Sequence, residues 1–322
     1  MIELRLTELD LLRLRFAVSP LWETLAAARV LTTRATTPAL RPWLDRIDPG
    51  ALDLSRLAAV QAPHGYTPDF LTPAPLAGER SIDAELDLVR QTPVAVVRAE
   101  LERCLQQRGL DRLLQELVRR PARARAQLAH DLEQVWSHLV APSWPRLHRV
   151  LAGDVDHRSR RLVDGGIAAL LEDLDPAVTW KDSTLRVDGI LAERRHLSGE
   201  GVVLLPSAFQ AGRPVVVLDP PYQPTLIYLA RGVATAWESS PAPAEALVRL
   251  LGRGRADLLA VLDEPAGTGV LAVLLGRSAG TVSEHLQTLR VSGLVDVRRT
   301  GQWSRWSRTS LGDALVAGRL PS

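Results

Sequence analysis

Cysteine and lysine are almost absent from this 322-residue chain, with Cys104 and Lys181 as the single example of each. One cysteine excludes an intrachain disulfide and a metal site built from several thiolates of one chain. A lone cysteine on a helical segment is typical of a small core residue, so we do not expect Cys104 to act as a redox sensor. The sequence predicts no metal site and no cofactor.

Long apolar runs are also missing. No stretch approaches the roughly 20 apolar residues that cross a membrane, and Met1-Ile2-Glu3-Leu4-Arg5 lacks a signal-peptide pattern. We therefore expect a cytoplasmic protein without membrane contact. The net charge is only +2, which excludes a uniformly basic nucleic-acid coat, so any basic surface must be local.

In the first three quarters of the chain, the predicted secondary structure changes from mainly helical to β-rich after about residue 173. Residues 1–20 have the alternation of one or two strands, around Ile2-Leu6 and Leu12-Phe16, and a helix is expected from Leu21. Residues 81–173 are helical almost throughout, and short β-like runs follow over 178–230. The expected helices are 81–91, 93–107, 109–118, 121–139, 142–152 and 154–173. We predict a mainly α (α+β) protein whose α-rich N-terminal domain, residues 1–238, contains a small antiparallel sheet and serves sensing or dimerisation.

The C-terminal quarter, residues 244–316, has the pattern of a separate domain after the Ser239–Pro243 linker. A short apolar helix over 270–275 is expected to end at Gly276, which suits a left-handed position. Ser278 is well placed as the N-cap of a second helix, from Ala279 to about Val291. The residues expected to form the buried stripe of that helix, spaced at i, i+4 and i+7, are Val282, Leu286 and Leu289.

A basic strand pair follows the second helix. Residues 294–299 and 303–308 read as two strands joined by a turn at Thr300-Gly301. From Arg290 to Arg308 there are five arginines (290, 298, 299, 305 and 308) and one acid, Asp296, which gives a local charge of +4. Two helices, a tight turn and a basic hairpin in this order form the plan of a winged helix-turn-helix. We therefore predict binding to double-stranded DNA.

The candidate DNA-binding residues come from the exposed face of the second helix and from the hairpin. Small and hydrogen-bonding side chains allow a helix backbone to lie deep in the major groove, and arginines suit phosphates or the minor groove. The predicted set is Arg277, Ser278, Gly280, Thr281, Ser283, Glu284, His285, Gln287, Thr288, Arg298, Arg299, Gln302 and Arg305.

Four side chains in this domain are considered separately. His285 borders the buried stripe, so packing or phosphate contact is favoured over base readout. Arg308 is expected, with the other hairpin arginines, to flank the adjacent minor groove or its phosphates. Trp306 is expected in the core, whereas Trp303 could be core or could close a dimer interface.

The order of residues in this domain supports a family resemblance. The matching segments are Gly254 to Leu262, Leu271-Ala272, Leu275-Gly276-Arg277-Ser278, Thr281-Val282-Ser283-Glu284-His285-Leu286, Leu289-Arg290, Gly293-Leu294-Val295 and Arg298-Arg299-Thr300-Gly301. Over about residues 244–315 the chain resembles the ArsR-type winged-helix regulators. The resemblance implies a homodimeric repressor that binds a palindromic operator and is released by an effector.

The remainder resembles a large N-terminal domain that some ArsR-like regulators carry and whose function is unassigned. The segments behind this resemblance are Ser19-Pro20-Leu21-Trp22-Glu23, Pro42-Trp43-Leu44, Asp69-Phe70-Leu71-Thr72-Pro73, Leu205-Pro206-Ser207-Ala208-Phe209, Pro224-Thr225-Leu226-Ile227-Tyr228 and Ala230-Arg231-Gly232. Two departures from the family stand out in residues 270–274. They lack the cysteine pair of the metal-sensing members, and they are apolar nearly all round. The sequence leaves open which effector, if any, is sensed.

Residues that could carry catalysis do not form a recognisable motif, so no catalytic residue is predicted. Gly252-Arg253-Gly254-Arg255 does not complete a dinucleotide-binding fingerprint, and Ser207 lacks the glycines of a nucleophile elbow. Asp154, Asp156 and His157 could offer metal ligands, but the neighbouring arginines favour a solvated helix start. Two alternatives to a DNA-binding regulator remain open: an enzyme fused to a winged helix, and a protein-interaction module.

Overall fold

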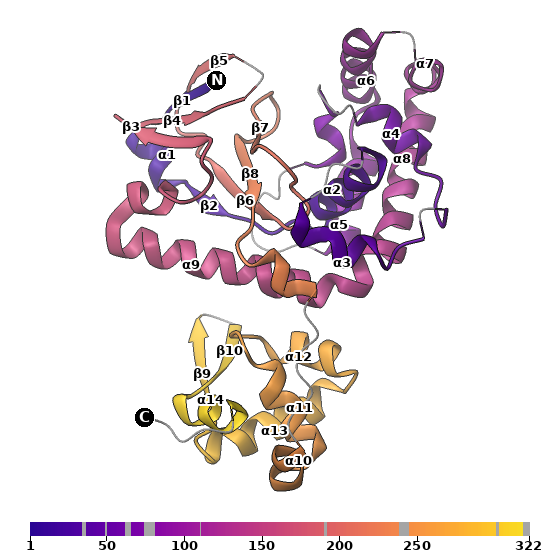
Figure 1. Ribbon diagram of the computed structural model, residues 1–322. Coiled ribbons are helices and arrows are strands. Elements are labelled where there is room, and N and C mark those ends of the chain that lie inside the picture. Colours follow the sequence, from indigo (N-terminus) through magenta and orange to yellow (C-terminus); the bar gives the residue numbers. More distant parts are fainter. Residues whose placement is uncertain are drawn as a thin grey trace. The chain divides into compact units, whose positions relative to one another are not determined.

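The computed structural model describes residues 1–33, 37–48, 50–61, 66–73, 81–109, 111–189, 192–237, 245–300 and 303–317. The chain forms two compact units (Figure 1). The N-terminal unit comprises Met1–Trp144 and Val150–Ala234, and the C-terminal unit comprises Thr235–Ser322 with Pro145–Arg149. Helices dominate and the sheets are small, so the predicted α+β class is confirmed.

The described residues of the N-terminal unit form two four-stranded sheets. The first has the order β3-β4-β1-β5 and the second the order β2-β6-β8-β7. Their strands are β1 (Ile2–Arg5), β2 (Arg15–Phe16), β3 (Val178–Lys181), β4 (Thr184–Val187), β5 (Glu193–His196), β6 (Val203–Ser207), β7 (Val215–Val217) and β8 (Thr225–Leu229).

The predicted single antiparallel sheet is wrong, because both sheets are mixed. In the first sheet β1 pairs antiparallel with β4 and parallel with β5. In the second sheet β6 runs parallel to both β2 and β8, and only β7 is antiparallel. Strand β6 is buried along its whole length and β8 nearly so. Parallel pairs occur where both faces are covered, and such strands are continuously apolar rather than alternating.

The first 20 residues contain less strand than their alternation indicates. Strand β1 forms as expected, but β2 is only two residues long. Before it, Glu8–Leu12 folds as helix α1 because Thr7 and Asp10 form a reciprocal capping box. Local capping thus replaces part of the second predicted strand.

The helices of the N-terminal unit lie beside the sheets, and the long helix α9 runs along the unit (Figure 1). Besides α1, they are α2 (Pro20–Thr33), α3 (Arg41–Leu44), α4 (Ser55–Val60), α5 (Ile82–Gln91), α6 (Val94–Arg108), α7 (Arg112–Arg119), α8 (Pro121–Val135) and α9 (Trp144–Leu171). Short 3-10 turns occupy Pro38–Leu40, Asp69–Leu71, Ala141–Ser143 and Val233–Trp237, and a π-helical turn occupies Trp136–Val140.

Four predicted helices agree with α5 to α8 within a few residues, whereas the break predicted at residue 153 is wrong. Helix α9 continues through Gly153 and is kinked instead at Gly166, where φ is 68°. Leu151 and Asp154, which flank Gly153, are both buried. Packing on both sides of an interior glycine offsets its weak helix propensity.

Buried carboxylates connect segments of the N-terminal unit that are distant in the sequence. Asp10 accepts hydrogen bonds from the N–H groups of Gly199 (2.8 Å) and Gly201 (3.0 Å). Glu23, at the start of α2, accepts one from the N–H of Ala208 (2.9 Å), just after β6. Two more buried carboxylates act in the same way, Glu85 with Ser19 and Leu21, and Asp154 with Tyr228 and Arg231. The half-buried Glu100 does so with Phe70 and Tyr222.

The solvated helix start expected around Asp154 is wrong. Asp154 is 2% exposed and Arg158 is 0% exposed. Arg158 forms an ion pair with Asp173 (2.5 Å), lies 3.8 Å from Asp154, and donates to the carbonyl of Leu170 (3.2 Å). A buried guanidinium persists only when it is paired in this way.

The described residues of the C-terminal unit form a group of helices and one pair of antiparallel strands. These are α10 (Glu245–Leu251), α11 (Arg253–Val261), α12 (Thr268–Leu275), α13 (Ala279–Val291), β9 (Val295–Thr300), β10 (Trp303–Arg308) and α14 (Ser310–Ala317). Its core joins Leu258 and Leu259 of α11 with Leu271 of α12, Leu286 of α13 and Trp306 of β10. Among the described residues, no helix is long and apolar enough to cross a membrane.

Candidate nucleic-acid interface

The turn between α12 and α13 has the geometry that the sequence predicts. Gly276 is left-handed, with φ 59° and ψ 37°, and the N–H of Arg277 closes the turn on the carbonyl of Ala272 (2.9 Å). Ser278 then caps α13, because its Oγ accepts a hydrogen bond from the N–H of Thr281 (3.1 Å). The cap satisfies one of the N–H groups that a helix start leaves without a partner.

Helix α13 buries one stripe and exposes another. Val282, Leu286 and Leu289 are at most 1% exposed, as predicted. The exposed members of the predicted set on this segment are Arg277, Ser278, Gly280, Glu284, Gln287 and Thr288, and those that are half-buried are Thr281, Ser283 and His285. The open face of α13 therefore carries small and polar side chains.

Arg277 and His285 reach across to α11. A Cβ atom added at Gly254 would lie 2.8 Å from His285 Nε2 and 3.4 Å from Arg277 Nη1. Arg277 also lies 3.9 Å from the carboxylate of Asp257. These contacts favour the packing interpretation of His285 and explain a glycine at position 254, where any larger residue would displace the imidazole.

The strand pair β9–β10 is packed on the unit by one of its faces. Trp306 is 4% exposed, forms an antiparallel bridge with Ala266, and donates its ring N–H to Thr268 Oγ1 (3.2 Å). Its position in the core is confirmed. Trp306 lies opposite Val297 in the register, so side chains two residues away share this inward face.

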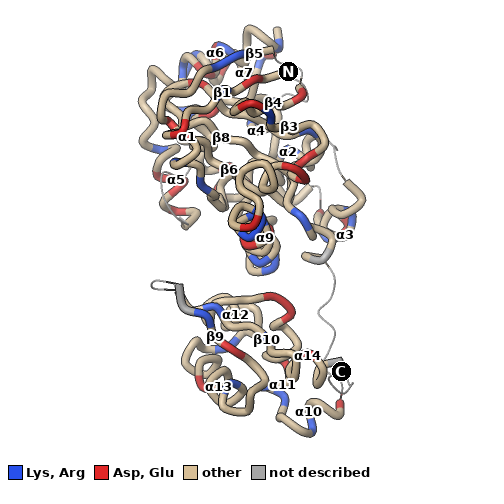
Figure 2. Tube along the Cα trace, turned by 90° about the vertical axis from the view of Figure 1, so that its left-hand side faces the viewer, with Lys and Arg blue, Asp and Glu red and all other residues tan. Residues whose placement is uncertain are grey.

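The opposite face of the strand pair carries two arginines at one register position. Arg298 of β9 lies directly opposite Arg305 of β10. Arg298 is exposed and Arg305 is half-buried. Among the described residues Arg298 has no ion-pair partner, and the basic residues of β9 appear in blue in Figure 2. Like charges directly opposite on a strand pair destabilise it, and a bound anion would remove that repulsion.

Arg308 differs from the other hairpin arginines, because it is used within the unit. Its Nε forms an ion pair with Asp313 (2.7 Å), and its Nη1 donates to the carbonyl of Leu259 (3.0 Å). The side chain is only 14% exposed. The structure therefore does not support the expectation that Arg308 flanks the minor groove.

Part of the predicted set cannot be placed. Gln302 and Gly301, expected at the tip of the hairpin, lie outside the described residues. Arg299 and Trp303 belong to β9 and β10, and their backbone alone is described.

Two perturbed carboxyl groups in the N-terminal unit bear on the enzyme alternative. Burial raises the pKa of Asp69 to about 7, an effect that its hydrogen bond from Tyr66 opposes. Burial also raises the pKa of Glu100, which accepts hydrogen bonds from Tyr222 (2.9 Å) and from the N–H of Phe70 (2.8 Å). These hydrogen bonds join α6, which carries Glu100, to Phe70 and to Tyr222.

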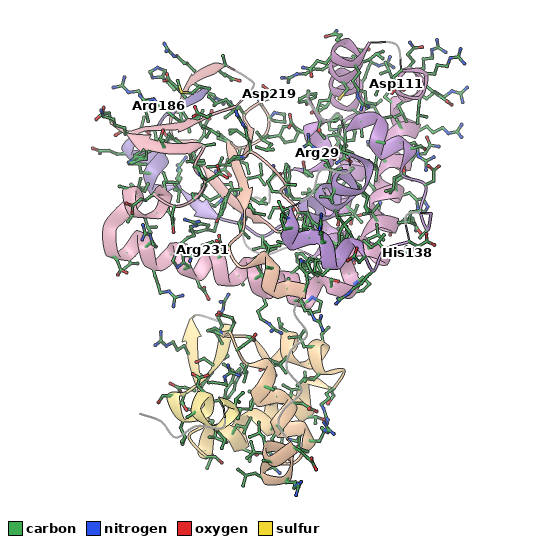
Figure 3. All side chains as sticks on the ribbon, in the orientation of Figure 1. Arg29, Asp111, His138, Arg186, Asp219 and Arg231 are labelled. Atoms are coloured by element: carbon green, nitrogen blue, oxygen red, sulfur yellow. The ribbon has the colours of Figure 1, made fainter. Side chains whose placement is uncertain are left out.

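The same cluster extends to the surface through an arginine. Arg103 pairs with Asp219, which Figure 3 labels, and its guanidinium lies 4.0 Å from the centre of the Tyr66 ring. Cys104 of α6 is 1% exposed beside this cluster, and burial raises the pKa of its thiol to about 12. The expectation of a core cysteine is confirmed. Among the described residues no group of three His, Cys, Asp or Glu side chains could hold a metal ion.

Comparison with known proteins gives one family and no function. Residues 92–234 match the model of a family of unknown function, DUF5937. Neither the curated proteins nor the solved structures contain a match. Apart from Pro145–Arg149, the matched segment lies in the N-terminal unit, and it does not include the candidate nucleic-acid interface.

Proposed function

We propose that residues 244–316 form a winged helix-turn-helix that binds double-stranded DNA, and that the chain is a one-component transcriptional regulator. The observation that carries the proposal is the order α12, left-handed turn, capped α13, β9 and β10, in which α13 leaves a small and polar face exposed. A recognition helix needs such a face to lie deep in the major groove.

Within this proposal α13 contacts base edges in the major groove, and the strand pair β9–β10 contacts the DNA backbone. Ser278 and Gly280 allow close approach at the start of the helix, where the N–H groups also favour a phosphate. Gln287 suits an adenine and Glu284 can accept from a cytosine amino group. Arg298 and Arg305 supply the charge that binds phosphates regardless of sequence.

We further propose a homodimeric repressor on a palindromic operator, in line with the ArsR-type resemblance. Two identical half-sites require a symmetric dimer whose recognition helices are about one helical turn of DNA apart. An effector would release the operator only if it binds the DNA-incompetent arrangement more tightly than the competent one.

A gel-shift titration of the full chain against the gene's own upstream region tests this function. The proposal expects a saturable, sequence-dependent shift at moderate salt that an unrelated duplex of equal length does not reproduce. Absence of that shift would remove the DNA-binding function. Saturable capture of another protein, with no shift, would favour the interaction module, and turnover of a small molecule would favour the enzyme.

A further inference from the structure

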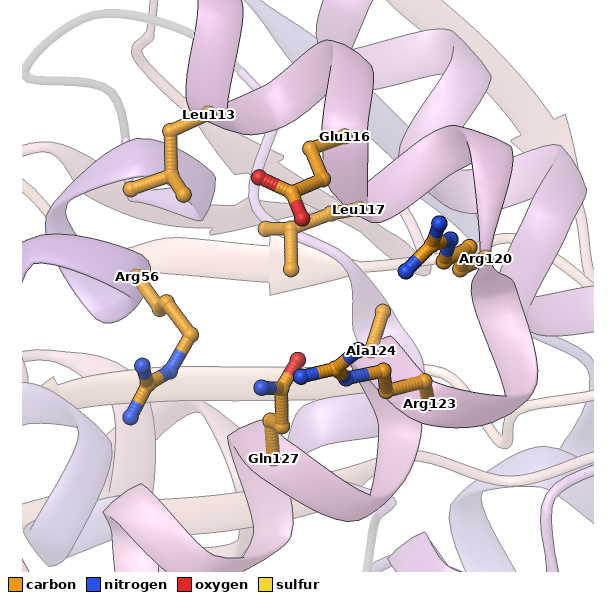
Figure 4. A pocket seen from close by; sticks show the side chains of 8 residues that line it. All are labelled: Arg56, Leu113, Glu116, Leu117, Arg120, Arg123, Ala124 and Gln127. Atoms are coloured by element: carbon orange, nitrogen blue, oxygen red, sulfur yellow. The ribbon is translucent and has the colours of Figure 1, made fainter.

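A pocket of about 210 Å³ lies among α4, α7 and α8 of the N-terminal unit (Figure 4). Its apolar side is formed by Leu113, Leu117 and Ala124. Leu117 and Ala124 are buried and Leu113 is half-buried. A cavity of about 150 Å³ can hold a benzene-sized molecule, so this pocket has room for one six-membered ring with a small substituent.

Guanidinium groups form the polar side of the pocket. Arg120, between α7 and α8, and Arg123, in the first turn of α8, point their head groups into the space (Figure 4). Both are exposed, and neither forms an ion pair with another described residue. Arg56 of α4 differs, because Asp131 accepts from its Nε (2.6 Å) and its Nη2 (2.5 Å) and neutralises it. Two arginines without an acidic partner therefore face an apolar wall.

One carboxylate, that of Glu116 on α7, also lines the pocket. Like Arg120 and Arg123, it has no ion-pair partner among the described residues. The two arginines and this carboxylate give the lining a net charge of +1, because Asp131 neutralises Arg56. A ligand with one negative charge balances it, whereas the second charge of a doubly charged ligand would be desolvated without a counter-charge. The lining is thus complementary to a singly charged anion with an apolar body.

We propose that this pocket binds a small organic carboxylate whose apolar body is about the size of one ring. The carboxylate would accept hydrogen bonds from Arg120 and Arg123, since the planar guanidinium matches a carboxylate in two-pronged geometry. The ring would lie on Leu113 and Leu117. This binding does not depend on the proposed DNA function, so either can fail without the other.

Isothermal titration calorimetry of the full chain with benzoate tests the proposal. Benzoate should bind saturably, and uncharged benzamide should bind about tenfold more weakly, because it forms no charge-assisted hydrogen bonds. Phenyl phosphate, which carries more than one charge at neutral pH, should bind more weakly than benzoate.

Three variants test whether benzoate binds in this pocket. Arg123→Gln should weaken benzoate about tenfold through loss of a charged donor. Arg119→Gln, at the exposed end of α7 and outside the pocket lining, is the matched control and should leave the affinity unchanged. Glu116→Gln should tighten benzoate and phenyl phosphate, a gain that loss of folding cannot produce.

Several results would overturn the pocket assignment. They are no saturable heat with benzoate, equal binding of benzoate and benzamide, or an equal loss of affinity in Arg119→Gln and Arg123→Gln. Unchanged affinity in Glu116→Gln together with tighter binding of phenyl phosphate would overturn the preference for a single charge.

Discussion

Glu23 shows how a single buried residue joins two segments of the N-terminal unit that stand out in the sequence. It ends the segment Ser19-Pro20-Leu21-Trp22-Glu23 and accepts from the N–H of Ala208, in the segment Leu205-Pro206-Ser207-Ala208-Phe209. Glu85 accepts from the start of the first segment, at Ser19 and Leu21. The two motifs are therefore the two ends of one buried hydrogen-bonded contact. Their spacing in the sequence, about 185 residues, gave no signal of it.

Glu23 also makes the stability of the N-terminal unit depend on pH. Burial raises its pKa from 4.5 to about 7, an effect that the hydrogen bond from the N–H of Ala208 opposes. A carboxyl whose pKa is raised by folding favours the native state below its unfolded pKa, and this contribution is lost as the pH rises through the folded value. Glu23→Gln should therefore gain up to about 3 kcal/mol relative to the wild type between pH 4.5 and pH 8.

Urea unfolding at pH 5 and pH 8, followed by tryptophan fluorescence, measures this difference. The exposed Glu102→Gln on α6 is the control variant and should change stability by less than about 0.5 kcal/mol. If the difference between Glu23→Gln and the wild type is the same at both pH values, Glu23 is not the titrating group.

Arg308 has a structural role, which distinguishes it from the arginines that we propose bind DNA. Because it donates to the carbonyl of Leu259 and pairs with Asp313, Arg308→Gln should destabilise the C-terminal unit by about 1–3 kcal/mol. Its DNA affinity, measured below the unfolding transition, should retain the salt dependence of the wild type. A normal melting temperature with a weaker salt dependence would instead place Arg308 against DNA.

At the scale of elements, the sequence predicted helix ends correctly where a single residue supplies a left-handed position or a cap. Gly276 and Ser278 fix the ends of α12 and α13, because one supplies a left-handed position and the other a cap. The mixed sheets could not be predicted in the same way. Strand β6 pairs in parallel with β2, which lies almost 190 residues before it, and with β8, which lies about 20 residues after it. The pocket residues Arg56, Arg120 and Arg123 meet only through helix packing, so their sequence positions gave no sign of a site.

The cap of α13 offers a test that distinguishes folding from binding. Ser278→Ala should cost about 1 kcal/mol of stability, whereas Ser278→Asp keeps a capping oxygen and should cost less than about 0.5 kcal/mol. If the start of α13 lies against a phosphate, the added carboxylate should lower DNA affinity roughly tenfold. Thermal melting and DNA titration of both variants measure the two effects. Full DNA affinity in Ser278→Asp would mean that this helix end does not contact the DNA backbone.

At the scale of the whole molecule, the chain joins two units with different relations to known proteins. The family of unknown function matches residues 92–234, whereas the resemblance of residues 244–315 to ArsR-type regulators stays a prediction from the sequence. The proposed DNA-binding surface and the proposed carboxylate pocket therefore lie in different units. A ligand in one can regulate the other only through a difference in its affinity for two states of the chain.

The salt dependence of DNA binding tests the proposed function most directly. Fluorescence anisotropy of the upstream duplex, titrated with the full chain at several salt concentrations, gives the slope of log affinity against log salt. Each phosphate contact contributes about −0.9 to that slope, so Arg298→Gln/Arg305→Gln should reduce its magnitude by about one to two and weaken binding to all sequences. Arg308→Gln, measured below its unfolding transition, serves as the arginine control whose slope should stay that of the wild type. We predict saturable binding with this reduced slope in the double variant, whereas no sequence-dependent binding, or an unchanged slope and affinity in the double variant, would contradict the proposal.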